Sequence, residues 1–213
     1  MQILYRGAES LIYLDTFDGQ EVIVKERVQK NYRIKQLDQK LRKLRTRKEV
    51  KLLTDVRKLG IPTPKIFHVD EKNHKIIMEN IQGNRLKEHL NSIPTNEVKS
   101  ICYQLGKQIG KLHSNNIVHG DMTTSNMILK DGQIYFIDLS LGEFTQRIED
   151  KAVDMKLLKE ALKSTHFKIF DEAWSYILHG YGKEYKNANS VLDQLKEIEK
   201  RARYANRETP YSL

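Results

Sequence analysis

The sequence is poor in cysteine and has no long apolar run. Cys102 is the only cysteine among 213 residues, which excludes an intrachain disulfide and a zinc site built from cysteines. No apolar run approaches the roughly 20 residues that a membrane-spanning helix needs. The first residues also lack the apolar stretch of a secretory signal. We therefore expect a cytoplasmic protein without membrane contact, in which Cys102 is a small buried residue on a helix.

Positive charge is concentrated in one stretch of the chain. The formal net charge is +9, and between Glu21 and Gly60 fourteen Lys/Arg face five Asp/Glu, so the rest of the chain is balanced. Such a stretch is either the solvated face of a helix or a surface for a polyanion such as nucleic acid. Both interpretations stay open. A second, smaller basic cluster lies near the C-terminus and consists of Lys200, Arg201, Arg203 and Arg207.

The residue patterns change character near residue 80. Residues 3–27 have the alternating β-branched residues that are typical of strands, on both sides of Asp18-Gly19, which predicts a hairpin. Residues 32–59 are helical in pattern and end at Gly60, and residues 75–81 form another candidate strand. Thr95 can cap a long amphipathic helix, and the rest of the chain is helical apart from a hairpin turning at Asp131-Gly132. We expect a hinge near residue 80.

The hairpin brings two candidate metal ligands together. Residues 117–126 read IVHGDMTTSN, and Asp138 ends the apolar run that follows. If the turn occupies Asp131 and Gly132, the ladder runs down to Asn126 opposite Ile137, beside Asp138. The register predicts proximity and not coordination geometry. A carboxamide and a carboxylate oxygen are hard ligands suited to Mg²⁺ bound with substrate phosphates.

The loop before the hairpin has the HxDxxxxN spacing of kinase catalytic loops. Asp121 is placed to orient an acceptor hydroxyl or a water molecule. The alternative, that Asp121 and Asp138 only cap turns, would explain either residue alone but not the full spacing. We expect His119 to brace the loop backbone, and we expect the buried carboxylate of Asp154 to find its partners there. His113 is expected to be structural.

Residues nearer the N-terminus complete this set. Lys25 ends the apolar strand VIVK, where its stem can pack while the ammonium meets phosphates. Glu49 is an acid among basic residues and could pair with Lys25, which the sequence does not decide. RGAES has one glycine where protein kinases typically have three, so its amides are a weak signal for phosphate binding.

Together these segments resemble a minimal protein-kinase-like fold. More specifically, the chain is similar over its whole length to the small atypical kinase family of the KEOPS complex, which is related to the RIO kinases. The motifs are GAES, VIVKER, LDQKLRKLRTRKEVKLL, IVHGDMTTSNMIL, IDLSLG and EDKAVDMKLL. The resemblance implies an α+β, bilobal architecture. It places a β-rich N-lobe with one major helix at 1–80, an α-helical C-lobe with the catalytic loop at 81–195, and a basic tail at 196–213.

The resemblance also implies a function. It is that of an ATP-dependent, non-specific Ser/Thr protein kinase or ATPase with ATP and Mg²⁺ as cofactors, supporting threonylcarbamoyladenosine (t6A) formation in tRNA. The implied partners are the threonylcarbamoyltransferase and other KEOPS-type subunits, with tRNA contacted by a basic helix at 33–51 and the tail. By the same resemblance Asp121 is the catalytic Asp, Glu49 positions Lys25, and Asn126 and Asp138 hold the metal. The implied ATP-binding residues are Gly7, Ala8, Glu9, Ser10, Lys25, Glu79 and Ile81.

Two features depart from ordinary protein kinases. Gly120 stands where an Arg commonly reads a phosphorylated activation loop, and the segment after Asp138 leads directly into a helix. ATP hydrolysis or autophosphorylation at a partner's interface is therefore favoured over broad protein phosphorylation. Two alternatives remain: a small-molecule phosphotransferase of the aminoglycoside- or choline-kinase type, and a tRNA-binding scaffold without catalysis.

Overall fold

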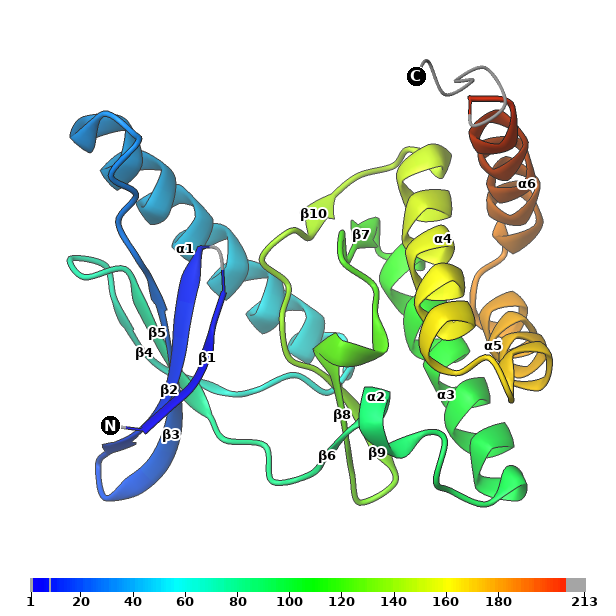
Figure 1. Ribbon diagram of the computed structural model, residues 1–213, viewed down its shortest axis with the longest axis horizontal. Coiled ribbons are helices and arrows are strands. Elements are labelled where there is room, and N and C mark those ends of the chain that lie inside the picture. Colours follow the sequence, from blue (N-terminus) through cyan, green and yellow to red (C-terminus); the bar gives the residue numbers. More distant parts are fainter. Residues whose placement is uncertain (1, 8, 206–213) are drawn as a thin grey trace, which may run out of the picture. The chain divides into compact units, whose positions relative to one another are not determined.

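The chain forms two compact units. The computed structural model describes residues 2–7 and 9–205, except for the side chains of 203–205. The first unit consists of residues 1–84 with 128–141, and the second of residues 85–127 with 142–213. Figure 1 shows the elements of each unit along the chain. The expected lobes, 1–80 and 81–195, differ from these units because residues 128–141 pack with the N-terminal part.

The first unit contains a five-stranded antiparallel sheet in the order β1-β2-β3-β5-β4. Its strands are β1 (Gln2–Arg6), β2 (Ser10–Phe17), β3 (Gln20–Arg27), β4 (Ile66–Asp70) and β5 (Lys75–Glu79). The β2–β3 turn lies at Asp18 and Gly19, as the sequence predicted, with φ of 49° and 76°. Both values lie in the left-handed region that two-residue hairpin loops require.

One long helix, α1 (Lys35–Lys58), belongs to the same unit. Its buried apolar residues are Leu52, Leu53 and Val56 in its C-terminal half. Leu37 and Leu44 are 50% and 54% exposed, so the buried apolar face does not continue to the N-terminal end of the helix. Asp38 and Glu49 are buried instead, because each is ion-paired with basic side chains.

The second predicted hairpin is also present. It consists of β8 (Met127–Lys130) and β9 (Gln133–Phe136), and in the turn Asp131 and Gly132 have φ of 50° and 73°. These strands form a three-stranded sheet with β6 (Asn84–Arg85) in the order β6-β8-β9. The Phe136 N–H donates to the Pro62 carbonyl at 3.0 Å. This contact ties β9 to the first unit.

The second unit is mainly helical. Its elements are α2 (Leu86–His89), α3 (Thr95–Ser114), β7 (Ile117–Val118), the 3₁₀ turn η1 (Thr124–Asn126), β10 (Glu143–Phe144), α4 (Ile148–Thr165), α5 (Phe170–Glu184) and α6 (Ala188–Ala205). The expected α+β class with one major helix beside a β-rich part is therefore confirmed. In the described part of the chain, no helix combines the length and apolar character needed to cross a membrane.

Helix α3 carries one confirmed prediction and one correction. Cys102 lies on it, buried, and burial raises the pKa of its thiol to about 12, so the thiol is inert at neutral pH.

Thr95 is not the N-cap of this helix. Pro94 occupies the N-cap position and makes no side-chain capping bond, and its carbonyl accepts the Val98 N–H at 3.0 Å. The helix therefore begins one residue after the cap, at Thr95 itself.

Candidate functional site

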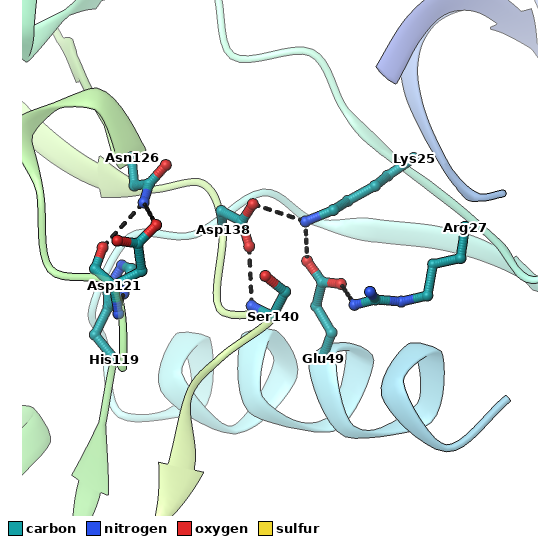
Figure 2. A network of polar contacts seen from close by, with 8 residues as sticks. All are labelled: Lys25, Arg27, Glu49, His119, Asp121, Asn126, Asp138 and Ser140. Carbon is teal, nitrogen blue, oxygen red and sulfur yellow. Dashed lines mark hydrogen bonds and ion pairs between the residues drawn. The ribbon is translucent and has the colours of Figure 1, made fainter. Parts of the chain in front are cut away.

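Lys25 lies in a buried ion-pair network of the first unit. Its Nζ is 2.6 Å from Glu49 Oε1 and 2.8 Å from Asp138 Oδ2 (Figure 2). Lys25, near the end of β3, and Glu49, on α1, are 3% and 0% exposed. The structure thus forms the pairing of Lys25 with Glu49, which the sequence left undecided.

The network keeps Lys25 and Asp138 charged. Burial alone would lower the pKa of the Lys25 ammonium, but Glu49 and Asp138 raise it above its usual value. Burial would raise the pKa of Asp138, but the Lys25 charge and the Ser140 N–H, which donates to its Oδ1 at 2.9 Å, lower it to about 2. An ammonium and a carboxylate therefore face each other at neutral pH. These are the charges needed to bind phosphate and a metal ion, respectively.

Arg27 belongs to the network and was not singled out from the sequence. Its Nη2 donates to Glu49 Oε2 at 2.6 Å, so Glu49 holds Lys25 with one oxygen and Arg27 with the other (Figure 2). Residues two apart on a strand point to the same face. The spacing of Lys25 and Arg27 in VIVKER was a signal that could have identified Arg27.

The second unit holds the predicted catalytic loop. Asn126 Nδ2 donates to the Asp121 carboxylate at 2.8 Å and to the Asp121 carbonyl at 2.9 Å. The side-chain oxygen of Asn126 consequently points away from Asp121, as Figure 2 shows. Asp121 itself is exposed. The amide nitrogen of Asn126 thus fixes the Asp121 carboxylate, and the role of its amide oxygen as a metal ligand stays a prediction.

The loop backbone is held by Asp154 of α4. Its two carboxylate oxygens accept the His119 N–H at 2.6 Å and the Gly120 N–H at 2.8 Å, and His119 Nδ1 accepts the Asp121 N–H at 3.3 Å. These are the supporting contacts that the sequence predicted for Asp154 and His119. Gly120 has a φ of 79°, a conformation that disfavours any side chain. The residue that departs from ordinary kinases is therefore needed for the shape of this loop.

His113 is structural, as expected. It is fully buried, and its Nδ1 lies 2.8 Å from the Tyr181 hydroxyl. Burial lowers the pKa of His113, so the ring stays neutral in the folded protein.

The candidate metal ligands suit Mg²⁺ better than zinc. Among the described residues, no group of three or more His, Cys, Asp or Glu side chains is arranged to hold a metal ion. The Asp138 carboxylate and the Asn126 amide oxygen are both hard oxygen donors, and they follow and precede the β8–β9 hairpin in the chain. Mg²⁺ takes few protein ligands and completes its shell with water and phosphate. The donor set fits that ion.

In the loop between β1 and β2, groups predicted to bind phosphate are already bonded to other parts of the protein. The Gly7 N–H donates to the Ser10 carbonyl at 2.9 Å, so this amide is already bonded. The Glu9 carboxylate pairs with Arg33 at 3.2 Å and with Arg45. Burial would raise the pKa of Glu9, but these two guanidinium groups lower it. Ala8, the fourth loop residue predicted to bind ATP, lies outside the described residues.

The predicted adenine-binding segment follows β5. The Glu79 N–H donates to the Lys65 carbonyl at 2.8 Å, and the Glu79 carboxylate accepts the Lys65 N–H at 3.1 Å. Ile81 is buried. The role of these two residues at adenine stays a prediction, and it would use main-chain groups other than the Glu79 N–H.

Much of the charge on the basic helix is neutralised within the first unit. Arg42 Nε lies 2.7 Å from Asp38 Oδ2, and Arg47 makes two bonds to Glu71, at 2.8 and 2.6 Å. The sequence did not predict the pairing with Glu71 because the two residues are far apart in the chain. Lys35 and Lys40, by contrast, are exposed and form no ion pair with a described residue.

The basic C-terminal cluster is only partly described. Lys200 pairs with Glu197 at 2.7 Å and Arg201 with Glu149 at 3.3 Å. Arg207 lies outside the described residues, as does the side chain of Arg203. The predicted contact of the tail with tRNA stays a prediction.

The chain is similar to proteins of one family. The family model described as the RIO domain matches residues 14–176. The KEOPS complex subunit Bud32 of Pyrococcus abyssi is 45% identical, over 97% of this chain and 98% of that protein. A probable bifunctional tRNA threonylcarbamoyladenosine biosynthesis protein of Methanocaldococcus jannaschii is 42% identical over 95% of this chain. This chain spans only 37% of the length of that bifunctional relative.

Two solved structures share the fold. The Rio2 kinase-ADP/Mg²⁺-phosphoaspartate complex from Chaetomium thermophilum has a TM-score of 0.66 and 14% identity, covering 96% of this chain and 72% of that chain. WaaP in complex with acyl carrier protein has a TM-score of 0.64 and 12% identity, covering 95% and 88%. At these identities the likeness concerns the fold alone, and it confirms the kinase-like architecture predicted from the sequence.

Proposed function

The chain belongs to the RIO family and is a homologue of the KEOPS complex subunit Bud32, and from this premise we propose that it uses Mg-ATP to support t6A formation in tRNA. Family membership supports kinase or ATPase activity in general. The finer proposal is an atypical, non-specific Ser/Thr kinase or ATPase working within a KEOPS-type assembly. The observation that carries it is the buried Lys25 that joins Glu49 to Asp138.

The network supports nucleotide binding through charge. Lys25 would turn its ammonium to the phosphates while Glu49 holds its position. Asp138 and Asn126 would hold Mg²⁺, which when bound neutralises charge on the phosphate oxygens. Asp121, whose carboxylate is fixed by the Asn126 amide at 2.8 Å, would orient the attacking hydroxyl or water. Each of these residues carries the charge or donor that its role requires.

Hydrolysis or autophosphorylation is favoured over phosphorylation of many proteins. After Asp138 the chain forms only the two-residue strand β10 before α4 begins at Ile148. A long activation segment that could support a peptide substrate does not fit between these residues. The physiological acceptor would then be a group on this chain, on a partner, or water.

The proposed partners are a threonylcarbamoyltransferase subunit, other KEOPS-type subunits and tRNA. The bifunctional relatives are named as tRNA threonylcarbamoyladenosine biosynthesis proteins, which supports a link between this chain and a t6A-forming protein. Exposed lysines at the N-terminal end of α1 support a contact with the tRNA backbone. The protein is proposed to act in the cytoplasm.

The test is ADP release from Mg-ATP by the purified chain, alone and with its cognate threonylcarbamoyltransferase subunit and tRNA. We expect turnover that the partner and tRNA stimulate. Asp138→Ala should abolish turnover without unfolding the protein. Asp171 is an exposed residue on α5, and Asp171→Ala should leave turnover unchanged.

Equal turnover with and without the partner would separate the ATP chemistry from t6A formation. Stimulation by small alcohols or aminoglycosides would favour the small-molecule phosphotransferase, and no turnover in any mixture would favour the tRNA-binding scaffold.

A further inference from the structure

Arg27 is a buried cation on the same face of β3 as Lys25. It is 4% exposed, and its side chain pairs with Glu49 at 2.6 Å. Its main chain is held from two sides: the Arg27 N–H donates to the His74 carbonyl at 3.1 Å, and the Arg27 carbonyl accepts from Arg42 Nη1 at 3.4 Å. Arg27 therefore connects Glu49 on α1 to a fixed point on the sheet.

The charges of the network balance only when Arg27 is counted. Lys25 and Arg27 are two cations, and Glu49 and Asp138 are two anions. Under the proposed function, Lys25 turns to the phosphates and Asp138 to Mg²⁺, so Glu49 must share its partner Lys25 with the nucleotide. Arg27 does not face that competition, because it contacts the other oxygen of Glu49. A guanidinium also stays charged at every physiological pH.

A contribution to fold stability does not explain why a buried Arg occupies position 27. Within residues 2–7 and 9–205, Arg27 Nε is buried without a hydrogen-bond partner. Burying a cation with one donor unpaired is costly, and an apolar side chain of similar size would avoid that cost. A buried Arg at this place is better explained by what it does to Glu49.

We infer that Arg27 is a positioning residue that keeps Glu49, and through it Lys25, in place while the nucleotide is bound. The inference rests on the proposed function and adds a residue to it. Glu49 remains available to Lys25 when Arg27 is removed, so ground-state binding of Mg-ATP should persist. The loss should fall on the step that needs Lys25 precisely placed.

The experiment measures kcat and KM for Mg-ATP in the full chain. Arg27→Met should lower kcat roughly 10- to 100-fold with KM changed less than about threefold. Arg27→Lys should recover part of the loss, because it restores the charge without the planar fork. Lys75→Met is the control: Lys75 pairs with Glu26 at 3.1 Å on the same sheet but does not contact the network, and its turnover should match the wild type.

A double variant separates positioning from a general structural effect. If Arg27 acts through Glu49, adding Arg27→Met to Glu49→Gln should lower kcat by less than about twofold further. Independent, multiplicative losses would overturn the inference, as would wild-type kcat in Arg27→Met. If Arg27→Met does not fold, Arg27→Lys and Arg27→Gln are compared: we expect the Lys variant to be faster, and equal rates overturn the inference. Absence of turnover in the wild type and in Lys75→Met would instead refute the proposed function.

Discussion

The carboxylate of Asp138 and the ammonium of Lys25 form an ion pair at 2.8 Å, although the proposed function assigns one to a metal ion and the other to phosphate. Each group thus neutralises the other. Binding of Mg-ATP has to replace this pair with two new interactions. Both charges that the proposed function needs are therefore present, but they are bonded to each other.

Replacing Asp138 by Asn should reveal a pH-dependent contribution to stability. The pKa of Asp138 is lowered in the folded state to about 2, from an ordinary value of 3.8. The carboxylate therefore stabilises the fold fully above pH 4, by roughly 2 kcal/mol, and the contribution is lost as the pH falls through 2. The free energies of unfolding of wild type and Asp138→Asn, measured without nucleotide, should differ most at pH 7 and converge between pH 4 and 2. A difference independent of pH would contradict the pairing.

Replacing Asn126 should change the requirement for metal more than the fold. Asn126 donates to Asp121 through its nitrogen, and its oxygen is the proposed ligand of Mg²⁺. Asn126→Ala should raise the Mg²⁺ concentration for half-maximal ATP turnover roughly tenfold or more, because one ligand is removed. Asn73→Ala, which removes an exposed turn contact to Asp70, is the matched control. An unchanged Mg²⁺ dependence would remove Asn126 from the metal site.

Charge reversal on the basic helix should weaken binding to tRNA. The residues that the charge count suggests, Arg42, Lys43, Arg45 and Arg47, are all ion-paired within the first unit. Lys35→Glu with Lys40→Glu is the cleaner test, because neither lysine pairs with a described residue. Affinity for tRNA should fall, and the negative slope of log K against log salt should become shallower by about one for each phosphate that the variant no longer neutralises. Lys183→Glu on α5 is the control, and equal affinity in both double and control variants would favour a solvated face.

Glycines let α3 and α5 approach closely. A Cβ at Gly106 would lie 2.0 Å from the Ile177 carbonyl oxygen, a backbone atom that cannot rotate away. Gly106→Ala should destabilise the protein by roughly 2–3 kcal/mol or more in chemical denaturation. Gly182→Ala, on α5 with no atom within 4 Å of the new methyl, should instead stabilise it by about 0.5–1 kcal/mol, because Ala favours the helix. Similar effects of both substitutions would refute the close packing of these helices.

Features predicted correctly from the sequence depend on neighbouring residues. Asp18-Gly19 and Asp131-Gly132 predict hairpin turns because a two-residue turn needs φ above zero at both positions. The spacing from His119 to Asn126 predicts a single loop, and within it Asn126 does bond to Asp121. Thr95 shows the limit of such local reasoning, since Pro94 takes the cap position and Thr95 opens the helix.

The sequence by itself determined the hairpins, the long helices, the catalytic-loop motif and the excess of charge between residues 21 and 60. Each of these features depends on residues that are close together in the chain. Only the tertiary structure decided that Glu49 joins Lys25 to Arg27, and that Glu9 and Glu71 neutralise arginines of α1. These pairs join residues more than twenty positions apart. Their formation depends on how strands and helix pack, and no local pattern encodes which of many equivalent charges will meet.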